Sequence, residues 1–183
     1  MTLPDVPETL ETDRLVVRPP RLDDVPDIYA AVCESLPDLQ PWMPWATAEY
    51  SLQSCEENTR TAVAHFITRE DLRYHFHDKT TGELLVCSGL HRIDWRVPKF
   101  EIGYWCRSSQ SGKGFVTEGV AALTTLALET LGAARVEIRC DDRNLRSAAV
   151  AERCGYTLEG TLHNETRSPT GELRSTRVYA RVK

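Results

Sequence analysis

A short loop with two glycines carries the residues whose types and spacing are best suited to chemistry. It lies between a predicted strand and a predicted helix and reads Ser111-Gly112-Lys113-Gly114-Phe115-Val116. Small residues in such a place expose backbone N–H groups, and a helix N-terminus adds about half a positive charge. The loop is therefore predicted to bind an anion such as a pyrophosphate, with positive charge nearby from Lys113 and Arg107.

Three kinds of phosphate-binding loop can be compared with this segment. A Walker A loop, GxxxxGK[ST], needs glycine at Arg107 and Ser or Thr at Gly114, so the pattern fails twice. A dinucleotide fingerprint, GxGxxG, needs a third glycine at Thr117 and belongs at the start of a strand–helix–strand unit. A coenzyme A loop is the remaining functional interpretation, and a flexible turn before a helix is the structural one.

The cysteines and histidines do not form a metal-binding pattern, so we predict no metal. The six cysteines are spaced 14 or more residues apart, whereas zinc sites use tight pairs. We expect reduced thiols packed as small apolar groups. His75 and His77 share one strand face. Histidines on a strand are more often exposed surface residues than metal ligands, so we interpret them as surface residues.

Length and charge exclude several other classes. The 183 residues match one domain, since domains average about 100–200 residues. The net charge of −5 argues against a surface for nucleic acid or anionic membranes, which needs a basic stripe. No apolar run reaches the ~20 residues of a membrane span, and residues 1–11 lack the features of a signal peptide. We therefore expect a cytoplasmic protein with neither nucleic-acid nor membrane partners.

Hydrophobic periodicity predicts the elements of the first half, which are a strand, two helices and an antiparallel meander of three strands. We expect them at residues 14–18, at 23 to about 34, at 51 to about 68, and at 74–78, 84–93 and 100–106. Asp23 and Ser51 are the predicted helix caps. Pro37 and Pro41 are expected to end the first helix.

The second half alternates between the two kinds of element. We expect a helix at 117–131 ended by Gly132, a strand at 135–140, a helix at 145–154, and strands at 156–167 and 174–182 joined by a turn at 168–171. The order β-α-α-β-β-β-α-β-α-β-β indicates a mixed α/β (α+β) domain. No repeat or Gly/Ser linker divides it, so we expect a single domain over residues 1–183, with its core at about 11–182.

Three segments together resemble the GNAT superfamily of N-acyltransferases. They are the strand 101–105 (EIGYW), the loop 112–114 (GKG) followed by Thr117-Glu118, and 144–147 (NLRS), with Gly155-Tyr156 eleven residues after Asn144. The opening 11–15 (ETDRL) and the segment 41–45 (PWMPW) are similar to its RimJ/RimL branch, which includes acetyltransferases of ribosomal-protein N-termini. The resemblance covers about residues 11–182.

The resemblance implies a mostly antiparallel, seven-stranded mixed sheet with a V-shaped opening between strands 100–106 and 135–140. Acetyl-CoA would lie there as the acyl donor, with its pantetheine arm paired to the open strand edges. The family loop usually starts with Gln or Arg and has Gly or Ala at position 116. The cofactor-binding residues implied are Trp105, Cys106, Ser111, Gly112, Lys113, Gly114, Phe115, Val116, Asn144 and Ser147.

Amide formation from a thioester needs a polarised carbonyl and a proton for the leaving thiolate. An amide near Trp105 or Cys106 would polarise the carbonyl. Many superfamily members have a Tyr seven residues after the Asn, where this chain has Ala151, and the RimL-like branch has a Ser that corresponds to Ser147. Ser147 is therefore the predicted general acid, directly or through a water.

Glu101 and Glu165 are the two predicted acceptors of the amine's proton. A charge on a central strand is unusual, which favours Glu101. The branch has a carboxylate near Glu165, but an ungapped count puts it at Thr166, and a one-residue slip reverses the strand face. An α-amine, with a pKa of about 7.7–8.0 against about 10.4 for lysine, needs less help from a base.

Trp42 and Trp45, with Tyr104, are expected to form a wall of the acceptor site, and a packed hydrophobic plug is the alternative for the two tryptophans. The predicted acceptor is a protein or peptide N-terminal α-amine. A small amine, such as an antibiotic, an amino acid or a nucleotide conjugate, is the alternative. A non-catalytic acyl-CoA-binding module and an interaction scaffold are two further hypotheses. The family often forms homodimers, although the sequence has no diagnostic interface.

Overall fold

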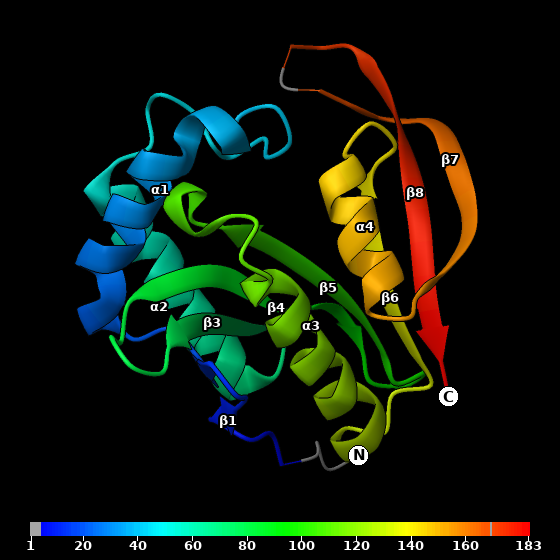
Figure 1. Cartoon of the computed structure of the whole chain (residues 1–183), viewed down its shortest axis with the longest axis horizontal. Coiled ribbons are helices and arrows are strands. Elements are labelled where there is room, and N and C mark those ends of the chain that lie inside the picture. The colour runs from blue at the N-terminus through cyan, green and yellow to red at the C-terminus, as the bar shows by residue number, and fades with distance from the viewer. Residues whose placement is uncertain (1–4, 169) are drawn as a thin grey trace.

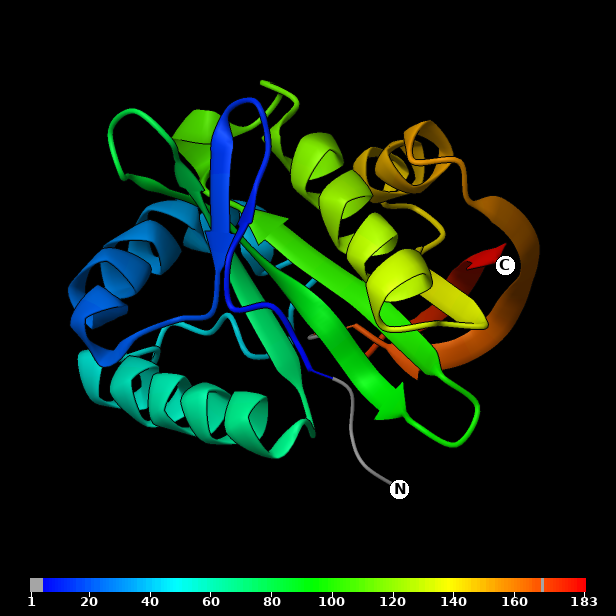
Figure 2. The ribbon, with the colours of Figure 1, turned by 90° about the horizontal axis from the view of Figure 1, so that it is seen from below.

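One mixed sheet of eight strands lies between two layers of helices (Figures 1 and 2). The structure is a computed structural model that describes residues 5–168 and 170–183. The strand order is β1-β2-β3-β4-β5-β6-β8-β7, and every neighbouring pair except β5–β6 is antiparallel. The strands are β1 (Leu10–Glu11), β2 (Leu15–Arg18), β3 (Leu72–Asp78), β4 (Leu84–Asp94), β5 (Lys99–Cys106), β6 (Arg135–Asp141), β7 (Thr157–Arg167) and β8 (Leu173–Val182).

The helices form a pair on each face of the sheet, α1 with α2 and α3 with α4 (Figure 2). They are α1 (Val25–Leu39), α2 (Leu52–Thr68), α3 (Phe115–Thr125) and α4 (Leu145–Arg153), with short helical turns η1 (Leu22–Asp24), η2 (Ser108–Gln110) and η3 (Leu126–Thr130). Within the described ranges, none of these helices has both the length and the apolar character needed to cross a membrane.

Successive side chains of β3 point to opposite faces of the sheet, and each face has its own hydrophobic core. Tyr74 and Phe76 are fully buried and belong to the larger core, which includes the apolar side of α3. His75 lies between them in sequence, points to the opposite face and lines a cavity under α1 and α2. The core on that second face is small and includes Val32 of α1 and Cys55 of α2. The sheet face under α1 and α2 is therefore less completely filled.

The parallel strands β5 and β6 pair only at their start. The register partners are Lys99–Arg135, Phe100–Val136 and Glu101–Glu137, and the pairing ends there. Beyond this point the strands separate, so β6, β8, β7 and α4 lie on one side of the opening and β1 to β5 on the other (Figure 1). The predicted V-shaped opening at the centre of the sheet is confirmed.

The first helix differs from the prediction at both ends. Asp23 is not its cap, because it lies in η1, and Asp24 occupies the N-cap of α1 without a side-chain capping bond. The helix then continues through Pro37 to Leu39. Proline removes one helical hydrogen bond, but the last turn buries Leu39 and keeps the bond from Gln40 N–H to Leu36 O, at 2.9 Å.

The number of strands differs from the prediction, and the cap of α2 agrees with it. The sheet has eight strands rather than seven, because Leu10–Glu11 adds a two-residue strand that pairs with β2. Ser51 caps α2 as predicted, and its Oγ accepts from Ser54 N–H at 3.1 Å. Two predictions fall partly outside the described residues. They are the interpretation of residues 1–11 as lacking the features of a signal peptide, because residues 1–4 are not described, and the turn at 168–171, because Pro169 is not described.

Candidate functional site

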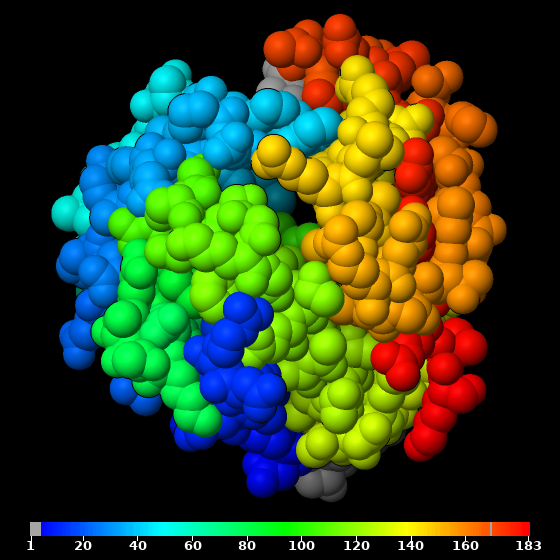
Figure 3. Space-filling model, viewed as in Figure 1, coloured from blue at the N-terminus to red at the C-terminus, as the bar shows by residue number. Residues whose placement is uncertain are grey.

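The separation of β5 and β6 leaves a cleft of about 1510 Å³ at the centre of the sheet. It appears as the hollow between the green segment before α3, the light-blue segment after α1 and the yellow α4 (Figure 3). Backbone groups that face it beyond Glu101 and Glu137 have no strand partner there, so an extended ligand can pair with them. The predicted cofactor-binding residues that line it are Trp105, Cys106, Ser111, Gly112, Gly114, Phe115, Val116, Asn144 and Ser147; Lys113 is not among them.

Two glycines shape the loop at the floor of this cleft. Gly112 and Gly114 have φ values of 78° and 84°, a region that favours glycine. Gly114 is the N-cap of α3 and supplies no side chain to the first N–H groups of the helix, which have no partner within the helix. The loop therefore presents backbone donors and the positive end of α3 to the cleft. This geometry fits a pyrophosphate.

Residues from the start of the chain hold the loop in place. Glu118 in the first turn of α3 accepts from Arg14 Nε at 2.6 Å and from the Thr12 hydroxyl at 2.5 Å. Burial opposes the charged form of Glu118, but the bonds from Thr12 and Arg14 outweigh it and lower the pKa. Arg14 also donates to the carbonyl oxygen of Lys113 at 3.0 Å. The β1–β2 turn therefore holds the middle of the loop and the first turn of α3.

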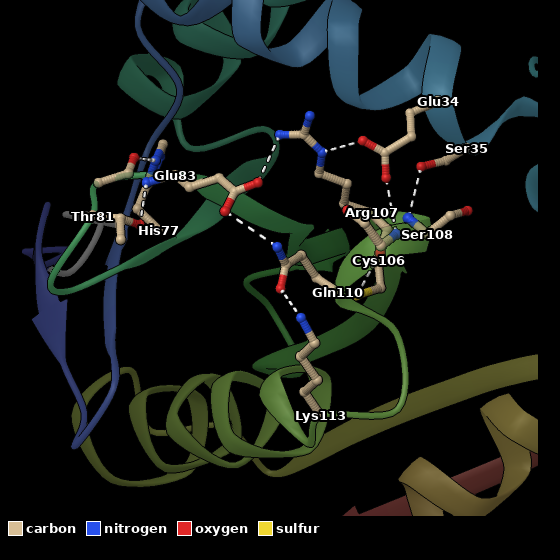
Figure 4. A network of polar contacts seen from close by, with 12 residues as sticks. Glu34, Ser35, His77, Thr81, Glu83, Cys106, Arg107, Ser108, Gln110 and Lys113 are labelled. Carbon is tan, nitrogen blue, oxygen red and sulfur yellow. Dashed lines mark hydrogen bonds and ion pairs between the residues drawn. The ribbon is translucent and has the colours of Figure 1, made fainter.

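Arg107 does not add free positive charge to the cleft as expected (Figure 4). Its guanidinium pairs with Glu34 of α1 at 2.5 Å and with Glu83 at 3.1 Å. Glu83 also accepts from Gln110 at 3.2 Å, and Gln110 accepts from Lys113 Nζ at 2.8 Å. Arg107 is thus a structural cation that joins α1, the start of β4 and the loop after β5.

Ser147 lies at the start of α4 beside the half-buried phenol of Tyr104. Asn144 caps this helix, because its Oδ1 accepts from Ser147 N–H at 3.1 Å. The Tyr104 hydroxyl donates to Ser147 O at 2.9 Å and lies 3.0 Å from Ser147 Oγ. Since a phenol has one proton, Ser147 is the donor in the second contact. Burial raises the pKa of Tyr104, so the phenol stays neutral.

The two predicted carboxylates differ in position. Glu101 lines the cleft at the last β5–β6 pair, and its carboxylate lies 3.3 Å from Arg92 Nε. Burial raises the pKa of Glu101, and Arg92 and Arg139 oppose that rise. Glu165 on β7 does not line the cleft and pairs with Arg139. A hydrogen bond from Thr176, together with Arg139, lowers the pKa of Glu165, which makes it a weaker base.

A second cavity of about 470 Å³ lies between α1, α2 and the sheet. Trp45 lies at this cavity, with its ring 6.1 Å from that of Trp105, whereas Trp42 lines the larger cleft. Tyr104 and Trp105 line both spaces, as do Met43 and Gly103. The two spaces therefore meet at β5, where a donor and an acceptor could approach each other from opposite sides.

The prediction missed a histidine–aspartate pair whose histidine lines the second cavity. His91 Nδ1 lies 2.6 Å from Asp71 Oδ2, and His91 lines the cavity. The two residues are 20 positions apart and meet only through the β3–β4 pairing. A sequence signal was present in Gly89-Leu90-His91, where glycine and histidine share one strand face.

Asp24, His75 and His77 also come together, with one ligand atom of each within 4.8 Å of the others. The two histidines are buried, so the expectation of a strand surface is wrong. Burial lowers the pKa of His75 to about 3. Arg18 binds both oxygens of Asp24 at 2.7 and 2.8 Å. Because this guanidinium already balances the carboxylate, we assign no cation to the cluster.

Comparisons of the sequence with known proteins point to one family. The model described as the acetyltransferase (GNAT) domain matches residues 14–157. The ribosomal-protein-serine acetyltransferase of Escherichia coli (strain K12) is 29% identical over 140 residues, 75% of this chain and 76% of that protein. The Bacillus subtilis protein YdaF is 40% identical over 79 residues, so the chain spans 43% of that relative's length.

Solved structures share the fold. The ribosomal L7/L12 α-N-protein acetyltransferase RimL, in complex with coenzyme A, has a TM-score of 0.89 at 23% identity, covering 96% of this chain and 98% of that chain. The microcin C7 self-immunity acetyltransferase MccE, in complex with acetyl-CoA and AMP, has a TM-score of 0.87 at 23% identity, covering 94% of each chain. The fold of this chain is therefore one that is found in acetyltransferases.

Proposed function

Because the chain belongs to the GNAT acetyltransferase family, we propose that it transfers an acetyl group from acetyl-CoA to the α-amine at a protein or peptide N-terminus. The observation that carries this proposal is the end of the β5–β6 pairing after Glu101–Glu137, beside the glycine loop of α3. The open edges suit a pantetheine arm, and the loop suits its pyrophosphate. RimL and MccE, named above, bind coenzyme A and acetyl-CoA.

The residues at the cleft supply the chemistry of transfer. Backbone N–H groups of β5 near Trp105 and Cys106 have no β6 partner, so one of them can polarise the thioester carbonyl. Ser147 then protonates the leaving thiolate, directly or through a water. Asn144 has its Oδ1 committed to capping α4, which leaves its amide N–H₂ group for the pantetheine arm.

The acceptor enters from the face covered by α1 and α2. Trp45 and Trp105 form the aromatic mouth of the smaller cavity there. An α-amine suits this site because more of it is neutral at pH 7 than of a lysine amine. The E. coli relative is named for a ribosomal-protein serine, which supports a protein N-terminus as acceptor. The cytoplasmic location and a homodimer remain predictions.

The test is thiol release from acetyl-CoA in the presence of purified protein and separate acceptors. The panel contains peptides with free N-termini, the same peptides with blocked N-termini and an internal lysine, and small amines. We expect release only with free N-termini. Release with small amines alone would move the acceptor to that class. Acetyl-CoA binding without any acceptor-dependent release would contradict the enzymatic proposal and leave a binding module.

A further inference from the structure

An imidazole–carboxylate pair of defined geometry lies at the smaller cavity, which its histidine lines. His91 Nδ1 and Asp71 Oδ2 are 2.6 Å apart, and the two side chains are 25% and 22% exposed. An ionised carboxylate can only accept hydrogen bonds, so Nδ1 carries the proton and donates it to Asp71. In the neutral imidazole the other ring nitrogen, Nε2, then has the free lone pair. This is the arrangement in which a carboxylate orients a general base.

The backbone makes room for this ring. Gly89 and Gly103 are register partners in β4 and β5. A Cβ on Gly89 would lie 2.7 Å from His91 Cε1, and a Cβ on Gly103 would lie 3.4 Å from Cδ2 and 3.7 Å from Nε2. The imidazole thus lies across two residues without side chains. The absence of these two side chains leaves space for the ring, and the bond to Asp71 fixes its orientation.

The pair lies close to the meeting point of the two cavities. Gly103, beneath Nε2, lines both spaces together with Tyr104 and Trp105. Two residues of a strand span about 7 Å, which is more than one water can bridge and within the reach of a chain of two waters. An amine held at Trp105 on the acceptor side would therefore be connected to His91 Nε2 by a short chain of waters.

The charges around the ring of His91 favour proton transfer to it and from it. Asp71 Oδ1 is buried and has no hydrogen-bond partner among the described residues, so the carboxylate stabilises positive charge on the ring once a proton arrives. Glu101 is the register partner of His91 on β5 and pairs with Arg92 at 3.3 Å. Arg73 on β3 lines the cavity and donates to Asn58 of α2 at 3.0 Å.

We propose that His91, positioned by Asp71, accepts the proton that the acceptor ammonium must lose before it attacks acetyl-CoA. This inference rests on the proposed function. The ammonium gives one proton to Nε2 through a short chain of waters, and the neutral amine attacks the thioester carbon. The C–N bond forms and the C–S bond breaks. The nitrogen loses a second proton as the bond to carbon forms, and the thiolate gains a proton through Ser147. His91 then releases the first proton to solvent.

The test compares acceptors that differ in the basicity of their amine. Three peptides of one sequence begin with alanine, 3-fluoroalanine or 3,3,3-trifluoroalanine, whose α-amine pKa values fall in that order. At pH 7 we expect His91→Gln to lower kcat/KM for the alanine peptide by roughly 10²-fold. The loss should nearly vanish for the trifluoroalanine peptide, because that amine is already neutral. Asp71→Asn should give the same pattern with a smaller loss.

The controls separate chemistry from structure. His65→Gln removes the histidine of an exposed pair with Glu70, 3.4 Å apart, and should change no rate. Acetyl-CoA affinity, measured by calorimetry, should be equal in wild type and all variants. An equal loss for the three peptides, or none, overturns this inference while the proposed function stands. A wild type that acetylates none of the peptides refutes the proposed function and the inference with it.

Discussion

Ser147 and Tyr104 form a two-hydroxyl unit at the centre of the molecule. Tyr104 comes from β5 and Ser147 from α4, 43 positions later, and the phenol holds both the carbonyl and the hydroxyl of Ser147. Ala151 is fully buried and has no hydroxyl. The phenol of this site therefore comes from a strand rather than from the helix position where many superfamily members have it.

This geometry predicts separate roles for the two hydroxyls. Ser147→Ala removes the predicted proton donor and should lower kcat by roughly 10²-fold, with little change in the Kd for acetyl-CoA. Tyr104→Phe keeps the ring and should lower kcat less, because Ser147 stays but loses its partner. Steady-state kinetics and calorimetry measure both effects. An unchanged kcat in Ser147→Ala would remove this residue from the proposed mechanism.

At the residue scale, sequence predicts groups that act through local structure. The loop from Ser111 to Val116 and the cap at Asn144 lie within short segments, so their spacing carries the information. Asp71 and His91 escape prediction because only the pairing of two strands brings them together. Arg107 is predicted as a free cation, yet Glu34 and Glu83 neutralise it from distant positions.

At the element scale, the packing of α3 on β3 depends on a glycine. A Cβ at Gly119 would lie 2.0 Å from Cε2 and 2.2 Å from Cδ2 of Phe76. Phe76 is fully buried in the larger core, so its ring has no free space to enter. Gly119 thus lets α3 approach the sheet closely and places the N-terminus of α3 at the cleft.

Gly119→Ala should destabilise the protein by about 1–3 kcal/mol, the usual cost of overpacking a core, despite the higher helix propensity of alanine. Chemical denaturation measures the change. Gly160→Ala on β7, where a Cβ meets nothing within 4 Å, is the matched control and should be close to neutral. Phe76→Leu in the Gly119→Ala background should recover part of the loss; no recovery would place the clash elsewhere.

Most elements are predictable because their apolar periodicity agrees with their caps and turns. Ser51 and the apolar face of α2 indicate the same helix start, for example. Pro37 wrongly predicts the end of the first helix, because burial of Leu39 and the hydrogen bond from Gln40 N–H to Leu36 O stabilise the last turn of α1. Strand β1 could not be predicted, because two residues are too few to show an alternation of apolar and polar side chains. Only its pairing with β2 defines it.

At the scale of the whole molecule, one ion-pair network connects parts that lie far apart in sequence (Figure 4). Glu34 at the C-terminal half of α1 pairs with Arg107 and accepts from Ser109 N–H at 2.9 Å, 75 positions away. Burial opposes its charge, but hydrogen bonds from Ser109 and Arg107 outweigh that effect and lower the pKa of Glu34 to about 2. The network therefore couples tertiary structure to pH.

The sign of this coupling follows from the lowered pKa. The stabilisation is fully present above the unfolded pKa of 4.5 and is lost as pH falls toward about 2. Glu34→Gln should lower stability at pH 7 by about 1 kcal/mol, allowing for partial exposure, and should flatten the stability curve between these pH values. Glu56→Gln, in an exposed pair with Arg60 on α2, is the control. A curve for Glu34→Gln parallel to that of wild type would contradict the prediction.

The incomplete β5–β6 pairing has a further consequence for the chain without ligand. It places two unpaired strand margins, those of Ile102–Cys106 and Ile138–Asp141, inside the sheet rather than at its rim. Such margins are templates for the addition of a foreign strand, the first step of aggregation. A molecule that fills the gap shields both margins at once. Saturation of the folded protein with its acyl donor is therefore expected to lower its tendency to aggregate.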